Sequence, residues 1–295
     1  MALADMLSAM RGIILDGLPL PQSENDREVL LRKYFPKLST EEANDLAQIP
    51  LEKLAIYTGT IFRGETGLLQ RLFPMSFALL RESATADANG EFSPFYFTKR
   101  LHKAYPWKSY QTVGLAQSFI SFIEAEISRL PNLPNALADI SNFEFLTLQI
   151  ARAKEAPPAS NIRLADLQQL TVSELLSCAC LVPLDTKFAQ YSFDTLKARR
   201  YFLLHQSLPT SEIDPRHVSL IGARDTENTV RWVEVPPELF SFLQSAQSAD
   251  SECVEDFAEA ALSSCQAEGD EERFRYFFEL LSQLVQSGAI VLSKE

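Results

Sequence analysis

The chain has 295 residues, of which 46% are hydrophobic and 22% charged, an ordinary balance for a globular protein. At about 100–200 residues per domain, this length predicts two domains. The apolar stretches are shorter than the roughly 20 residues that span a bilayer. Asp5 precedes Arg11 near the N-terminus, where a secretion signal would need a basic region and then a continuous apolar core. We therefore expect a cytoplasmic protein that does not enter a membrane.

The first 155 residues predict a helical bundle domain. Ser39 and Thr40 are suitable N-caps for a helix that runs through Phe62, with a break at Pro50. Pro74, within the apolar run 67–80, predicts a kink or a helix boundary. Further predicted helices cover residues 67–80, 95–105, 114–130 and 130–153, and the polar stretch 85–94 predicts a loop.

Lys154–Asn161 is polar, contains two adjacent prolines and has no periodicity, so we place the domain boundary there. In the C-terminal domain, over 160–295, the runs at 199–207 and 217–224 predict strands. The second pairs with 229–235 in a predicted β-hairpin. Helices at 237–246, 252–265 and 270–287 follow, with Gly288 as the stop of the last helix, and then a strand at 289–292. The fold class predicted is mainly α, with an α+β winged-helix-like second domain.

Residues typical of catalysis are scarce. The three histidines, His102, His205 and His217, stand in no metal-binding spacing, and no G-x-S-x-G, Walker A or G-x-G-x-x-G motif occurs. Cys178 and Cys180 form C-x-C without a second pair at metal-ligand spacing, so we expect reduced thiols and no metal site. We therefore expect a chain that is not an enzyme and holds no cofactor.

The distribution of charge argues against DNA binding more strongly than the net charge of −12 does. A winged helix that reads DNA inserts a basic helix into the major groove. The stretch from Trp232 to Glu272 contains eleven Asp and Glu residues and no Lys or Arg. The alternative site for nucleic acid is a basic patch that comprises Lys99, Arg100, His102, Lys103 and Lys108, interleaved with Tyr105 and Trp107. The competing interpretation of this patch is a solvated helix end with aromatic packing.

Peptide binding is the remaining function for the second domain. A small sheet with an exposed edge binds an extended peptide as an additional strand. Because the domain is acidic, we expect a peptide with basic or apolar anchors. The candidate contacts are Val218, Leu220, Val230, Trp232, Phe274 and Phe278, and the alternative for each is a place in the hydrophobic core.

The order of several short motifs resembles the HvfC/BufC family, whose N-terminal domain carries a DNA-binding label. The motifs are Tyr57 in LAIYTGTIFRGE, LLQRLFP (68–74), FTKRLHKAYPWKS (97–109), GLAQSFISFI (114–123), the helix at 133–153, SLIGAR (219–224), TVRWVEV (229–235) and PPELFSFLQSA. The first 40 residues or so and the stretch 180–196 depart from the family pattern.

The resemblance implies a non-catalytic partner of a multinuclear non-heme iron-dependent oxidase. Such oxidases modify ribosomally made precursor peptides. The chain would form a heterodimer with the oxidase and bind the leader of the precursor peptide through its C-terminal domain, while the iron belongs to the oxidase. The competing readings are a DNA-binding transcriptional regulator, as the family label suggests, and an enzyme in its own right.

Overall fold

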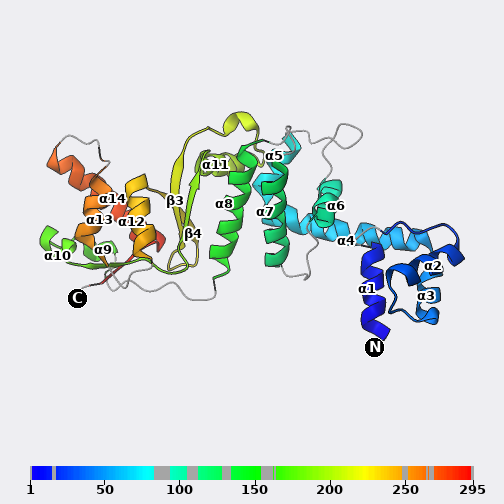
Figure 1. Cartoon of the computed structure of the whole chain (residues 1–295). Coiled ribbons are helices and arrows are strands. Elements are labelled where there is room, and N and C mark those ends of the chain that lie inside the picture. Colours follow the sequence, from blue (N-terminus) through cyan, green and yellow to red (C-terminus); the bar gives the residue numbers. More distant parts are fainter. Residues whose placement is uncertain are drawn as a thin grey trace. The chain divides into compact units, whose positions relative to one another are not determined.

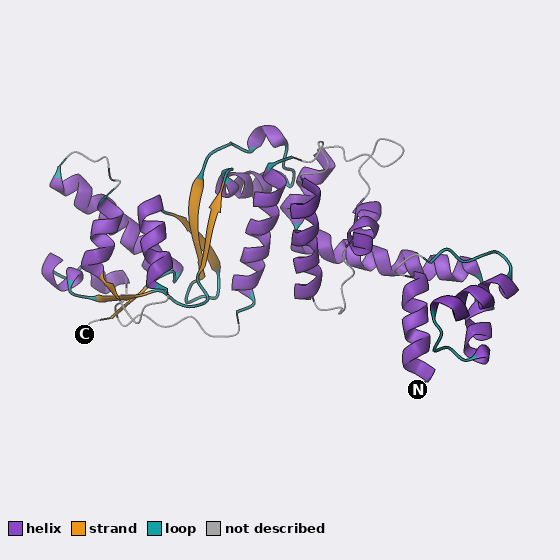
Figure 2. Cartoon of the chain, viewed as in Figure 1, coloured by secondary structure: helices purple, strands orange, loops and turns teal. Residues whose placement is uncertain are grey.

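The chain folds into two compact units, Met1–Pro134 and Asn135–Glu295 (Figure 1). The structure, a computed structural model, describes residues 2–14, 18–82, 94–104, 112–127, 134–153, 162, 164–247, 252–263, 265 and 269–293. It is mainly helical, with small antiparallel sheets in the second unit (Figure 2). None of the described helices combines the length and the apolarity needed to span a membrane.

The first unit is helical, and its helix boundaries follow the predicted caps. Ser39 and Glu42 form a capping box, with the Ser39 amide donating to Glu42 Oε2 over 2.7 Å. Pro50 precedes one helix, and Pro74 is a boundary, not a kink, because it begins the next helix. The predicted helical run 67–80 is therefore divided between these two helices. The helices are α1 (Ala2–Ile14), α2 (Glu24–Tyr34), α3 (Thr40–Ala47), α4 (Leu51–Leu72), α5 (Pro74–Glu82), α6 (Pro94–Ala104) and α7 (Thr112–Ile127).

The second unit contains two three-stranded antiparallel sheets, ordered β2-β3-β4 and β5-β1-β6. The predicted hairpin and the three helices after it are present, and Gly288 ends the last helix with a φ of 75°. The elements are α8 (Ala136–Ala151), α9 (Leu164–Leu167), α10 (Val172–Leu176), β1 (Ala179–Leu181), β2 (Lys187–Tyr191), α11 (Thr195–His205), β3 (Val218–Arg224), β4 (Val230–Glu234), α12 (Pro237–Ala246), β5 (Glu252–Cys253), α13 (Val254–Leu262), α14 (Asp270–Ser287) and β6 (Val291–Ser293).

Helices cover both faces of the β2-β3-β4 sheet (Figure 1). Helix α8 lies on one face, where Phe143 packs against Tyr191 and Trp232. Helices α12 and α14 lie on the other face, in the core that includes Ile221 and Val233. The central strand β3 is consequently buried along its whole length.

Helix α8 belongs with the second unit because of these contacts. Asp139 near its start accepts hydrogen bonds from the amides of Ser192 and Phe193, over 2.7 and 3.1 Å. Arg224 of β3 donates to the Ala153 carbonyl just beyond its end, over 2.9 Å. The compact units therefore divide before α8, whereas the sequence suggested a division at 155–160. The predicted linker, residues 154–161, lies outside the described residues.

Residues 199–207, predicted as a strand, lie in and just after helix α11 instead. The side chain of Asp194 caps this helix by accepting a hydrogen bond from the Lys197 amide, over 2.9 Å. The apolar run misled the prediction because Leu203 and Leu204 are exposed, 60% and 79%, rather than part of a core. Strands β1 and β2 had no predicted counterpart.

Candidate peptide-binding groove

The six predicted contact residues lie in three different places. Leu220 is fully buried and Val218 is 4% exposed, and both belong to the core between α8 and the sheet. On α14, Phe274 is 42% exposed and stacks on Phe278, with ring centroids 6.2 Å apart. Only Val230 and Trp232 border the groove that follows the outer side of β4. The structure thus separates the core residues from a smaller candidate site.

The groove has a volume of about 550 Å³ and runs along β4, the last strand of its sheet. Helix α11 borders one side and helix α14 the other. Its lining consists of Leu196, Arg199, Arg200, Thr229, Val230, Arg231, Trp232, Val233, Glu234, Gln283, Gln286 and Ser287. Every residue of β4 therefore contributes to the lining.

The register of the hairpin determines which peptide groups of β4 face the groove. The Val235 amide donates to the Ser219 carbonyl over 2.9 Å, and the Asp225 amide donates to the Thr229 carbonyl over 3.0 Å. Because antiparallel pairing alternates along a strand, the odd-numbered residues of this segment bond to β3. The amides and carbonyls of Val230, Trp232 and Glu234 consequently point outward. Within the described residues, β4 has only β3 as a neighbouring strand, and no backbone hydrogen bond from outside the sheet reaches these three residues.

The turn between β3 and β4 is organised by Asp225. Its Oδ1 accepts from the amides of Glu227 and Thr229, over 2.9 and 2.8 Å, and its Oδ2 accepts from Arg231 Nε over 2.6 Å. Burial raises the pKa of Asp225, but these hydrogen bonds outweigh the burial and hold that pKa below its ordinary value. The carboxylate form of Asp225 thus stabilises the start of β4.

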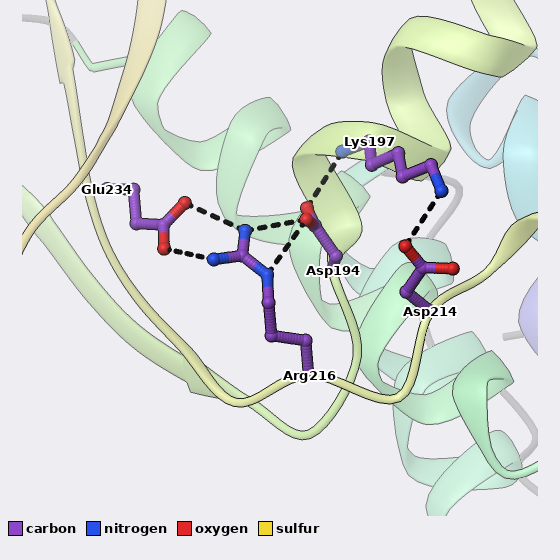
Figure 3. A network of polar contacts seen from close by, with 5 residues as sticks. All are labelled: Asp194, Lys197, Asp214, Arg216 and Glu234. Atoms are coloured by element: carbon purple, nitrogen blue, oxygen red, sulfur yellow. Dashed lines mark hydrogen bonds and ion pairs between the residues drawn. The ribbon is translucent and has the colours of Figure 1, made fainter.

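An ion-pair network fixes the other end of β4 (Figure 3). Arg216 donates to Asp194 Oδ2 over 2.6 Å and to Glu234 Oε1 over 2.7 Å. Since Asp194 caps α11 and Glu234 ends β4, Arg216 joins the start of the helix to the end of the strand. Burial alone would raise the pKa of Asp194. The hydrogen bonds from the Lys197 amide and Arg216 outweigh burial and hold that pKa below its usual range. Lys197 also bonds to Asp214 over 2.7 Å.

Three arginines give the groove a positive lining. Arg231 is paired with Asp225, whereas neither Arg199 nor Arg200 lies within ion-pair distance of a described carboxylate. Arg200 does act on Asp194 through its charge, which helps to lower the pKa of that carboxyl. Arg199 is half-buried, and this burial lowers the pKa of its guanidinium. The lining contains one carboxylate, Glu234, which is already bonded to Arg216. This local charge differs from the acidic surface on which we based the expectation of basic or apolar anchors.

A second hollow, of about 650 Å³, lies at the end of the same sheet. Glu234 borders both hollows, so the two adjoin at the Arg216 ion pairs. The remaining lining of the second hollow is Gln190, Tyr191, His217, Val218, Ser219, Val235, Pro236, Pro237 and Tyr276.

His217 borders the second hollow, whereas His102 and the alternative basic patch belong to the first unit. His102 is fully buried, with its ring against Phe62 at a centroid distance of 5.6 Å, and Arg100 pairs with Glu126 over 3.0 Å. Both are therefore engaged within the first unit. The other residues of this patch, Lys99, Lys103, Tyr105, Trp107 and Lys108, have side chains outside the described part of the structure.

Sulfur and carboxylate groups form no recognisable metal centre in the described ranges. The four cysteines are free thiols. No cluster of three or more His, Cys, Asp or Glu side chains suited to a metal ion occurs among the described residues.

In comparisons with known proteins, no protein-family model matches the chain and no similar curated protein is found.

Proposed function

We propose that this chain is a non-catalytic partner protein that binds the leader of a precursor peptide as a fourth strand along β4. It would present that peptide to a multinuclear non-heme iron-dependent oxidase. The observation on which the proposal rests is the groove along β4, in which three successive outward peptide units meet no partner among the described residues. Strand addition uses such an edge, with backbone hydrogen bonds for affinity and alternate side chains for selectivity.

The fold around the groove supports this proposal. A hairpin followed by three helices and a short closing strand is the order expected of a winged-helix-like recognition domain. Helix α8 and the Asp225 turn make β4 rigid before any peptide arrives, which reduces the entropy lost on binding. The likeness of the sequence to the HvfC/BufC family supplies the partner: the oxidase would hold the iron and perform the oxidation.

The edge of β4 is tested most directly by the substitution Val230→Pro. Proline lacks an amide hydrogen, but the amide of Val230 points into the groove, so the hairpin ladder stays intact. We expect the precursor peptide encoded beside the oxidase to bind the full-length variant at least tenfold more weakly in calorimetry. The matched control is Val230→Ala, which shortens the side chain and keeps the amide.

Circular dichroism checks that both variants fold. As a second measurement, two forms of the precursor peptide are N-methylated, one at every odd and one at every even amide. One form should no longer bind the wild-type chain, because its hydrogen-bonding amides are blocked, and the other should still bind. Equal binding by Val230→Pro and Val230→Ala, together with indifference to N-methylation, would contradict strand addition at β4.

A further inference from the structure

The groove along β4 is positively charged in a strongly acidic protein. The chain has a formal net charge of −12, yet the groove presents Arg199, Arg200 and Arg231 against the single carboxylate of Glu234. Arg231 pairs with Asp225, and Arg216 is shared between Glu234 and Asp194. Arg200 also acts on Asp194 through its charge. The cations that an occupant of the groove meets are therefore the half-buried Arg199, for which no ion-pair partner is found among the described residues, and the exposed Arg200.

Arg199 and Arg200 both lie on one side of the position that a strand added to β4 would occupy. Leu196, one turn before them on α11, packs in the same core cluster as Phe143 and Trp232, on the face of the sheet that α8 covers. On the opposite face, Gln283 and Gln286 of α14 border the groove. Side chains of an added strand alternate between faces, so every second residue would point toward α11.

The position of α11 is fixed before any peptide binds. Asp194 caps the helix, and Arg216 ties that cap to Glu234 at the end of β4. Arg199 and Arg200 follow within the next turn and a half, so their place beside the strand is set by the network in Figure 3. Arg199 is half-buried without an ion-pair partner among the described residues, so its desolvation is not compensated there. An anion that forms a charge-assisted hydrogen bond with Arg199 would offset part of that cost.

We infer that the peptide bound along β4 carries acidic side chains at alternate positions, which pair with Arg199 and Arg200 on the α11 side. The inference rests on the proposed function and names the class of peptide that the groove selects. The opposite face of the same peptide, toward Gln283 and Gln286, meets neutral amides and takes uncharged residues.

Fluorescein-labelled peptides of the sequence TEVEVET, TQVQVQT and TKVKVKT test this inference with the full-length chain. Their charged positions all lie on one face of an extended strand. We expect the glutamate peptide to bind about tenfold more tightly than the glutamine peptide in fluorescence anisotropy, and the lysine peptide to bind most weakly. The double substitution Arg199→Glu/Arg200→Glu should reverse this order, and Arg199→Gln/Arg200→Gln should abolish it.

A control with the same change in total charge is Lys53→Glu/Arg63→Glu, at two exposed positions of α4. It should leave the order of the three peptides unchanged. A reversal there would mean that net charge, not the groove, decides the preference, and would overturn the inference.

The remaining outcomes separate the inference from the proposed function. If the three peptides bind equally well and Val230→Pro weakens all of them, the preference for acidic peptides is wrong and strand addition stands. If none of the three binds while the precursor peptide does, the preference for acidic peptides is overturned and strand addition stands; if the precursor peptide does not bind either, both fail. If single-stranded oligonucleotides displace the glutamate peptide at equal concentration, with a steep dependence on salt, the arginines recognise phosphate and the inference is overturned.

Discussion

Replacing Gly222 of β3 by alanine should destabilise the second unit and displace Trp232, which borders the groove. A Cβ at this position would lie 2.7 Å from two ring atoms of Trp232 and 2.8 Å from Ile150 Cδ1. The indole has little freedom to move, because its Nε1 donates to Thr147 Oγ1 over 3.0 Å and Phe143 packs on its ring.

Overpacking of this kind costs about 1–3 kcal/mol, and a displaced indole also loses its hydrogen bond, worth about 0.5–1.5 kcal/mol. The lower chain entropy of alanine returns about 0.5–1 kcal/mol. We therefore expect Gly222→Ala to lower the free energy of unfolding by about 1–3 kcal/mol.

Urea unfolding of the full-length chain, followed by tryptophan fluorescence and circular dichroism, measures this change. The control is Gly64→Ala in α4, where an added Cβ meets nothing within 4 Å, and which should be neutral or stabilise by about 0.5–1 kcal/mol. An unfolding midpoint for Gly222→Ala at or above that of the wild type would refute the packing described for Trp232.

Three further results are expected. Asp225→Ala should lower the free energy of unfolding by about 1–3 kcal/mol in urea titrations, since the amides of Glu227 and Thr229 and the Arg231 guanidinium lose their acceptor. A smaller loss with Asp225→Asn would confirm that Oδ1 matters most. The unfolding midpoint should fall as the pH drops below about 4. The pKa values of Asp194 and Asp225 are lower in the folded than in the unfolded chain. The stabilisation from these carboxylates is therefore complete above the unfolded pKa and is lost as the pH falls through the folded pKa. The double substitution Asp194→Asn/Asp225→Asn should flatten this pH profile. A wild-type midpoint that rises toward acidic pH would contradict the stabilising role of these two carboxylates. Duplex DNA should show no gel shift even at low salt, because Trp232–Glu272 contains no Lys or Arg; a shift that weakens steeply with salt would favour the DNA-binding alternative.

Local signals in the sequence were sufficient for most helices and for the hairpin. Caps and prolines such as Ser39, Pro50 and Gly288 define helix ends through short-range interactions, which the sequence displays directly. The alternation in 229–235 identified β4 and with it Val230 and Trp232, the two predicted residues that border the groove. Strands β1 and β2 are short, with three and five residues, and lack such a pattern.

The sequence failed where contacts between distant segments decide the structure. The run 199–207 is as apolar as a strand, and the signal that it belongs to a helix is Asp194, five residues earlier. Because α11 was predicted as a strand, Arg199 and Arg200 were not connected with β4, about 30 residues farther along the chain. No sequence pattern within or next to α8 indicates that this helix packs against β3.

Helix α8 has a consequence for how the protein is divided experimentally. A fragment that starts at residue 160 omits the helix that covers Leu220, the partner of the Trp232 indole and the acceptor for Arg224. Such a fragment would present a bare apolar sheet face, and its binding would report on exposed core rather than on the groove. Because these contacts join α8 to the sheet, we expect a fragment that ends after α8 to reassemble with a fragment that starts at residue 160. Recovery of peptide binding at the groove would measure that reassembly.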